Sequence, residues 1–141
     1  MKARTMARIL IAEDDDNVRQ FVQRALLHLG HDVTAVEDGG LAAEAADAAA
    51  GGFDLLLSDI KMPVMDGIAL ALHVGARWPQ TTILLMTGFA DQRERAHGLE
   101  ALIYDVIQKP FSLADLVAKV DAALNGRPAE IVSLAQRAAE G

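Results

Sequence analysis

Short apolar runs alternate with helical patterns through residues 9–124, and this alternation limits the possible folds more than any other feature of the sequence. The apolar runs, which we predict to be strands, lie at residues 9–12, 33–36, 54–58, 83–86 and 103–107. Each is followed by a segment long enough for a helix, which favours parallel strands joined by crossovers. Runs that are apolar throughout indicate strands covered on both faces. The pattern therefore predicts an α/β domain with a five-stranded parallel sheet and helices on both faces.

The segments between the strands carry apolar residues at spacings of three and four, as on one face of an α-helix. This spacing predicts helices at residues 18–29, 68–76 and 112–124. We also expect an alanine-rich helix at residues 41–49 and a short polar helix at residues 91–97. Asp16 is placed to cap the first helix, and Gly30 suits the left-handed position at its end. Ser112 and Asp115 have the spacing of a capping box. The predicted inner faces are Val18, Phe21, Val22, Ala25, Leu26 and Leu29 on the first helix, and Leu113, Leu116, Val117, Val120 and Leu124 on the last.

The composition is that of a folded, acidic protein. Among 141 residues, 13 are basic and 20 acidic, giving a net charge of −7. Nucleic acids attract clustered lysines and arginines, and no such cluster is visible in this acidic sequence. We therefore expect no nucleic-acid partner. No apolar stretch approaches the roughly 18 residues that span a bilayer, so we expect no membrane association. The chain has no cysteine, which fits a reducing cytoplasm.

The length favours one domain. We expect an N-terminal extension at residues 1–6, the α/β domain at residues 7–126 and a short C-terminal tail at residues 127–141. The tail carries a weak apolar stripe, which leaves either a helix or a disordered segment open. The residues of this stripe are Ile131, Leu134, Ala135 and Ala138.

Charged and hydroxyl side chains follow four of the five predicted strands. They are Glu13, Asp14, Asp59, Thr87 and Lys109. Binding sites in open parallel sheets form at the carboxyl ends of the strands, so these side chains are expected to meet at one edge. Any one of them alone is more often an ordinary polar residue at a strand end. The combination points to a site.

Three carboxylates at that edge repel one another unless a cation lies between them. Oxygen ligands suit Mg²⁺, whereas the absence of cysteine and of a histidine at a strand end disfavours zinc. We expect Asp14 to bind Mg²⁺, with Glu13 holding it directly or through water. Asp59 and the backbone carbonyl of Lys61 would complete the protein ligands.

Asp59 is the natural nucleophile of the set, because it stands alone at the end of the central strand and carboxylates can attack phosphorus to form acyl phosphates. The metal ion and the Lys109 ammonium would neutralise the phosphoryl oxygens. Thr87 offers a hydroxyl that can donate to one of them. The sequence therefore predicts a phosphoryl-accepting site at Asp59.

Several motifs around these residues resemble the response regulator receiver family over about residues 7–126. The matching motifs are the acidic pair Glu13-Asp14, the acceptor Asp59, the loop Met62-Pro63-Val64-Met65-Asp66-Gly67, the pair Thr87-Gly88 and the triplet Lys109-Pro110-Phe111. The resemblance implies a flavodoxin-like (βα)₅ receiver fold with strand order 2-1-3-4-5. It also implies Mg²⁺ and a phosphodonor that is a histidine kinase or a histidine phosphotransferase. The Lys109-Pro110 bond is a candidate cis peptide.

One position departs from the family pattern. Receivers usually carry an aromatic residue three positions before the conserved lysine, and here that position is Val106. Tyr104 lies two residues earlier, and alternate residues of a strand share a face. Tyr104 is thus a candidate for a related switching role, with simple packing at the strand edge as the alternative.

Residues 7–16 and 86–96 resemble the CpdR-type stand-alone receivers of alphaproteobacteria. Those receivers take phosphoryl groups from a histidine phosphotransferase and, when unphosphorylated, prime the ClpXP protease for selected substrates. No output domain fits after residue 124, so we expect the output of a cytoplasmic monomer to be a protein-binding surface on the fourth helix, fifth strand and fifth helix. The alternative is that the fourth helix is an ordinary solvated helix.

Two functions remain open from the sequence. The first is a switch whose partner-binding surface depends on Asp59 phosphorylation, and the second is an intermediate phosphoryl carrier with no regulated partner. An aspartyl-phosphate phosphatase is disfavoured, because Lys61 stands where such an enzyme needs a second aspartate. A flavodoxin that binds FMN is disfavoured because no phosphate-binding loop follows the first strand. We therefore expect no enzyme activity beyond phosphotransfer and self-dephosphorylation.

Overall fold

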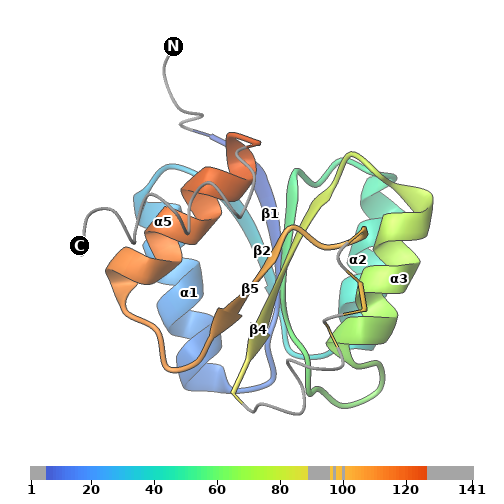
Figure 1. Cartoon of the computed structure of the whole chain (residues 1–141), viewed down its shortest axis with the longest axis horizontal. Coiled ribbons are helices and arrows are strands. Elements are labelled where there is room, and N and C mark those ends of the chain that lie inside the picture. The colour runs from blue at the N-terminus through green and yellow to red at the C-terminus, as the bar shows by residue number, and fades with distance from the viewer. Residues whose placement is uncertain (1–5, 89–95, 97, 100, 127–141) are drawn as a thin grey trace.

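Five parallel strands form one sheet in the order β2-β1-β3-β4-β5, as predicted (Figure 1). The computed structural model describes residues 6–88, 96, 98–99 and 101–126. The strands are β1 Arg8–Ala12, β2 Asp32–Val36, β3 Leu55–Asp59, β4 Thr82–Thr87 and β5 Asp105–Gln108. The helices are α1 Asp16–His28, α2 Gly39–Ala49, α3 Gly67–Arg77 and α5 Leu113–Leu124. The fold is the predicted flavodoxin-like one.

Helices cover both faces of the sheet, with α1 and α5 on one side and α2 and α3 on the other (Figure 1). The strands divide their apolar side chains between these layers, because successive side chains point to opposite faces. In β1, Ile9 and Ile11 belong to the core beneath α1 and α5, whereas Leu10 and Ala12 belong to the core beneath α2 and α3. All four are buried. This double burial explains why the strands are apolar throughout.

The parallel register brings the carboxyl ends of the strands to one edge. Ala12 of β1 lies opposite Ser58 of β3, and Asp59 lies opposite Met86 of β4. Thr87 in turn lies opposite Gln108 of β5. The residues at or just beyond these positions therefore meet, as predicted from the strand order.

Helix boundaries follow local capping. The N-cap of α1 is Asp15 and not Asp16 as predicted, because the extended Asp15 directs its Oδ1 to the backbone N–H groups of Asn17 (2.9 Å) and Val18 (3.1 Å). Gly30 has a φ of 93°, which confirms the left-handed position after this helix. The capping box of Ser112 with Asp115 is confirmed at the start of α5.

Two strands are displaced from their predicted positions. β3 begins at Leu55 and includes Asp59, so the predicted acceptor is the last residue of the strand and not the residue after it. β5 begins at Asp105 instead of residue 103. The residue before it, Tyr104, already donates its backbone N–H to Ile83 O (2.7 Å).

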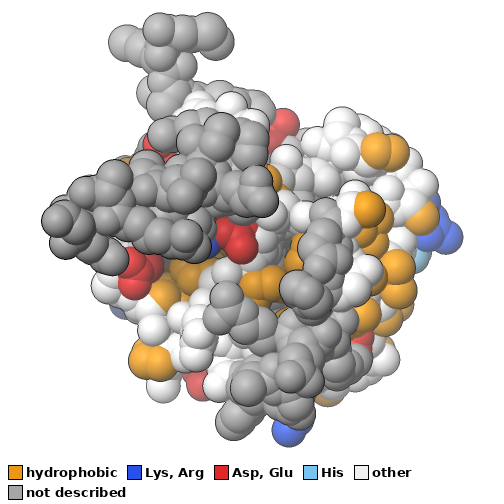
Figure 2. Space-filling model, viewed as in Figure 1, with side chains coloured by type: hydrophobic (Ala, Val, Ile, Leu, Met, Phe, Trp, Pro, Cys, Tyr) orange, Lys and Arg blue, Asp and Glu red, His pale blue; other side chains and the backbone are white. Residues whose placement is uncertain are grey.

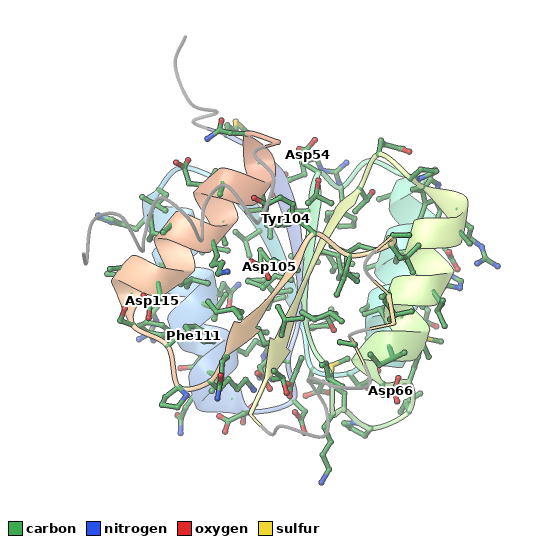
Figure 3. All side chains as sticks on the ribbon, viewed as in Figure 1. Asp54, Asp66, Tyr104, Asp105, Phe111 and Asp115 are labelled. Atoms are coloured by element: carbon green, nitrogen blue, oxygen red, sulfur yellow. The ribbon has the colours of Figure 1, made fainter. Side chains whose placement is uncertain are left out.

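Tyr104 does not share a face with Val106, so the expectation based on strand alternation is wrong. Tyr104 packs in the layer of α1 and α5, whereas Val106 packs in the layer of α2 and α3. The alternation fails because Tyr104 precedes the regular strand. The next residue, Asp105, forms an ion pair with Lys119 of α5. Figure 3 shows Tyr104 and Asp105 in succession along this segment.

Three predicted inner-face residues are exposed instead of buried. Phe21 and Leu29 of α1 have 41% and 42% of their surface exposed, and Leu113 of α5 has 52%. Val22, Leu26, Leu116 and Val120 are buried as expected. The sheet therefore covers only part of the apolar surface of these two helices. On the other side of the sheet, Figure 2 shows apolar side chains over α3, where Leu72 is half exposed.

Some predictions fall outside the described residues. The helix predicted at residues 91–97 is described only at Ala96, which is buried against the α2 and α3 layer. The tail at residues 127–141 and most of the extension at residues 1–6 are also outside. In the part of the chain that is described, no helix is long and apolar enough to span a bilayer.

Val64 has a backbone conformation that suits glycine or asparagine. Its φ is 70°, its side chain is 85% exposed, and the Pro63 carbonyl accepts the Met65 N–H (2.8 Å) across it. A β-branched residue is strained there. We expect Val64→Gly to raise the free energy of unfolding by about 1 kcal/mol in urea denaturation. Val64→Ala keeps the Cβ and should gain less, and an equal gain in both variants would contradict the strain.

Candidate functional site

All of the predicted site residues except Thr87 line one cleft of about 370 Å³ at the carboxyl edge of the sheet. They come from the carboxyl ends of β1, β3, β4 and β5 or from the loops that follow, so the parallel register brings them together. The lining residues are Glu13, Asp14, Asp15, Asp59, Lys61, Gly88 and Lys109.

Three carboxylates gather in this cleft. Glu13, Asp14 and Asp59 each offer an oxygen, and these oxygens all lie within 4.8 Å of one another. Glu13 and Asp59 are buried and Asp14 is exposed. A set of oxygen donors open to water on one side fits a hard divalent cation that keeps some of its water ligands, as Mg²⁺ does. The donor chemistry thus agrees with the predicted metal.

Lys109 bridges the two buried carboxylates. Its Nζ lies 2.5 Å from Glu13 Oε1 and 3.3 Å from Asp59 Oδ1. The other carboxylate oxygen of Glu13 accepts the Asp15 N–H (3.0 Å), and Asp59 Oδ1 also accepts the Ile60 N–H (3.0 Å). The ammonium places a compensating positive charge beside both buried carboxylates.

The surroundings of Glu13, Asp59 and Lys109 raise the pKa of all three groups. Burial raises the pKa of Glu13 to about 7, because desolvation outweighs the hydrogen bonds from Lys109 and Asp15. Burial also raises the pKa of Asp59, against the opposing charge and hydrogen bond of Lys109. Burial alone would lower the pKa of Lys109, but the hydrogen bond to Glu13 and the two negative charges raise it. Lys109 therefore stays positive, while the carboxylates gain a proton more readily than usual.

Thr87 lies at the end of β4, next to the lining residue Gly88, and Lys61 lines the cleft itself. Thr87 is the buried last residue of β4, and its carbonyl accepts the Lys109 N–H (2.7 Å). Lys61 is an exposed lining residue, two positions after Asp59. The Lys109-Pro110 peptide is cis, as the sequence had suggested. The structure thus brings every predicted site residue to this edge.

The loop after Asp59 is held by close backbone packing that we did not predict. Gly67 donates its N–H to Ile60 O (2.7 Å), and a Cβ on Gly67 would lie 2.1 Å from Asp59 O. A Cβ on Gly39 would lie 1.9 Å from Met65 O, so α2 presses on the same loop. The sequence shows these glycines but not the backbone that they touch.

Arg19 is a further residue that the sequence reasoning missed. Its Nη1 donates to the Glu13 carbonyl (2.9 Å), and its Nη2 pairs with Asp16. The arginine side chain is 17% exposed. It ties the loop that carries the acidic pair to the first turn of α1. The spacing of three between Asp16 and Arg19 was the one visible signal, since such residues are neighbours on a helix.

The comparison with known families decides what this site belongs to. Residues 9–121 match the model of the response regulator receiver domain. The chain belongs to the response regulator receiver family. The match spans the sheet from Ile9 onwards and most of α5, and it includes every residue of the carboxylate and lysine cluster.

Known relatives and structures agree with this assignment. The receiver is 40% identical over 116 residues to the response regulator receiver protein CpdR of Brucella abortus, covering 82% of this chain and 95% of that protein. It is 38% identical to the transcriptional activator protein PfeR of Pseudomonas aeruginosa, covering 92% of this chain and only 42% of that protein.

Among solved structures, the receiver domain of the sensor histidine kinase PA1611 from Pseudomonas aeruginosa is similar to this receiver, with a TM-score of 0.74 and 29% identity. The alignment covers 84% of this chain and 98% of that one. That structure has a magnesium ion coordinated in the active-site cleft. A receiver that is similar to this one therefore holds a magnesium ion in its active-site cleft.

Proposed function

We propose that the protein accepts a phosphoryl group on Asp59 from a phosphohistidine donor, either a histidine kinase or a histidine phosphotransferase. The observation that carries this proposal is the buried Asp59 carboxylate at the mouth of a cleft, with Lys109 Nζ 3.3 Å away and two further acids beside it. In the reaction, an oxygen of Asp59 bonds to phosphorus as the bond from phosphorus to the donor imidazole nitrogen breaks. The imidazole leaves with the electron pair and takes up a proton.

Mg²⁺ is the proposed cofactor. Glu13, Asp14, Asp59 and the Lys61 carbonyl would hold it, and the bound ion would supply positive charge to the phosphoryl oxygens. Lys109 adds a second positive charge 3.3 Å from Asp59 Oδ1, the oxygen that also accepts the Ile60 N–H. The Thr87 hydroxyl donates to a phosphoryl oxygen once it has arrived.

Phosphorylation is tested by mass spectrometry of the intact protein after incubation with acetyl phosphate and Mg²⁺. The proposal expects an added mass of one phosphoryl group, lost in Asp59→Asn and on addition of EDTA. The control variant Asp54→Asn changes an aspartate at the opposite end of β3, where Asp54 accepts the Arg8 N–H (2.8 Å). An adduct that persists in Asp59→Asn would place the acceptor elsewhere.

Arg19→Ala is expected to weaken Mg²⁺ binding roughly tenfold, because a lost charge-assisted hydrogen bond is worth about 1.4 kcal/mol. The Glu13 carbonyl would lose the donor that fixes the acidic loop. Isothermal titration of Mg²⁺ measures the effect, and Arg24→Ala, on the same helix but lining a hollow away from the cleft, is the matched control. Equal affinities in the two variants would show that Arg19 does not position the site.

The proposed output is a protein-binding surface that changes when Asp59 is phosphorylated. The protein would be a cytoplasmic monomer, with a receiver unit at residues 7–126, an extension at residues 1–6 and a tail at residues 127–141. Following the CpdR resemblance, the partner would be the ClpXP protease or its substrates. The 40% identity to CpdR over nearly the full length of that protein supports this choice. Self-dephosphorylation would return the protein to its resting state.

Affinity capture separates this switch from a phosphoryl carrier without a regulated partner. Purified ClpX and its adaptor-dependent substrates are tested against immobilised wild-type protein, with and without acetyl phosphate, and against Asp59→Ala. The switch requires that capture differ between phosphorylated and unphosphorylated wild type and stay constant in Asp59→Ala. Capture that ignores phosphorylation of the wild type would leave the carrier function.

A further inference from the structure

A groove runs along the outer side of α1, between this helix and the start of α5. It is a hollow of about 570 Å³ whose apolar lining is Phe21, Ala25, Leu29, Leu113 and Val117. Polar side chains of α1, among them Gln20, Arg24 and His28, form its rim. Figure 3 shows Phe111 beside α1 at the end of the groove near the phosphoacceptor edge, and its ring lies 6.3 Å from that of Phe21.

The lining residues are those that helical periodicity assigns to the inside of the protein. Phe21, Leu29 and Leu113 nevertheless have about half of their surface exposed. Exposed single apolar residues are ordinary, but a contiguous row of large ones along two adjacent helices indicates an interaction surface. The described residues end at Gly126, directly after α5, and α1 and α5 both end at the edge of the sheet opposite the phosphoacceptor.

We propose that residues 129–140 form an amphipathic helix that docks in this groove. At helical spacing their apolar side chains fall on one face and their polar side chains on the other. The apolar face contains Ile131, Leu134, Ala135 and Ala138, and the polar face contains Ser133, Arg137 and Glu140. Alanine, leucine, glutamate and arginine favour helix, but a helix of this length is marginal in water without a surface to pack on.

The geometry of the chain permits this docking. α1 and α5 both run from the phosphoacceptor edge towards the opposite edge, where α5 ends (Figure 1). Gly126 has a φ of 70°, a left-handed conformation that turns the chain out of α5, and Pro128 cannot continue that helix. Twelve residues of helix extend about 18 Å at 1.5 Å per residue, which matches the length of α1.

The charges agree with an antiparallel orientation. A segment that starts at Gly126 and runs back along α1 meets the C-terminal half of that helix first. Arg24 and His28 lie on the rim there, and Glu130 is the acidic residue at the start of the segment. Ala138 would then lie near Gln20, closer to the phosphoacceptor edge.

Disulfide trapping tests this arrangement in the full chain, which has no cysteine of its own. Gln20→Cys with Ala138→Cys is expected to form an intramolecular disulfide under mild oxidation roughly tenfold faster than Leu72→Cys with Ala138→Cys, because docking raises the local concentration of the two thiols. Leu72 is exposed on α3, on the other side of the sheet. Equal rates would overturn the proposal, and so would disulfides that form only between molecules, which would indicate a second copy in the groove.

Methyl NMR supplies a test that leaves the groove intact. Leu134→Asp should shift the methyl signals of Leu29, Leu113 and Val117, while Ser133→Asp adds the same charge on the opposite face and should leave them in place. The methyl groups of the buried Leu70 serve as the reference for an unaltered fold. Groove signals that move equally in both variants, or in neither, would overturn docking through the apolar face.

Discussion

Replacing Gly67 with alanine is expected to lower the free energy of unfolding by about 3 kcal/mol, because the new methyl group has no space. The added Cβ would lie 2.1 Å from Asp59 O and 2.9 Å from Ile60 Cα. Both contacts are to backbone, so relief requires that α3 or the end of β3 move. The hydrogen bond from Gly67 N to Ile60 O (2.7 Å) resists that movement. The gain in helix propensity from alanine is only about 1 kcal/mol.

Urea denaturation measures this loss, and Gly88→Ala is the matched control. A Cβ at Gly88 would meet no atom of the described residues within 4 Å, so its cost should stay within about 0.5 kcal/mol. The Gly67 variant should also accept phosphate from acetyl phosphate more slowly, since Asp59 is displaced from Lys109. A Gly67→Ala protein as stable as Gly88→Ala would show that the contact between α3 and β3 yields easily.

Stability without Mg²⁺ is expected to fall by about 3 kcal/mol between pH 4.5 and pH 8 as Glu13 loses its proton in the folded state. The pKa of a glutamate carboxyl group is ordinarily 4.5, as in the unfolded chain, and burial raises the pKa of Glu13 to about 7 in the folded protein. Because folding raises the pKa of Glu13, this group contributes its stability in full below pH 4.5, and the contribution is lost as the pH rises through about 7. Burial raises the pKa of Asp59 as well, so its contribution changes in the same direction.

Urea denaturation at pH 5 and pH 8 in the presence of EDTA measures this dependence, with Glu13→Gln as the control. Glutamine cannot ionise, so this variant should lose much of the pH dependence and keep only the part due to Asp59 and groups elsewhere. Mg²⁺ should restore stability at pH 8 and do little at pH 5, where the protons compete with it. A stability that is the same in wild type at both pH values would contradict the raised pKa.

Much of the fold could be predicted from the sequence because its signals are local. Apolar runs such as residues 9–12 indicate buried strands, and the capping box at Ser112 marks the start of α5. The site could be predicted for a related reason. Parallel strands end at one edge, so placing Glu13, Asp59 and Lys109 at or after the carboxyl ends of three strands was enough to bring them to that edge.

The errors occurred where a local pattern does not specify its surroundings. Asp15 and Asp16 are equivalent as capping residues, and only the backbone angles of Asp15 select it. Tyr104 was assigned to the face of Val106 because alternation was extended beyond the true start of β5. Phe21 and Leu113 have the periodicity of buried residues, but they lie on parts of α1 and α5 that the core does not cover.

The sequence by itself determined the alternation of strands and helices, the edge at which the site forms and the chemical types of its side chains, because these follow from periodicity, connection length and residue chemistry. The strand order followed from the resemblance to the receiver family. Only the tertiary structure decided that Lys109 holds both Glu13 and Asp59, and that Arg19 anchors the acidic loop. It also decided that Gly67 touches the backbone of Asp59. These are contacts between residues distant in the chain or between backbone atoms, and their distances depend on how the elements pack and not on the identity of any one residue.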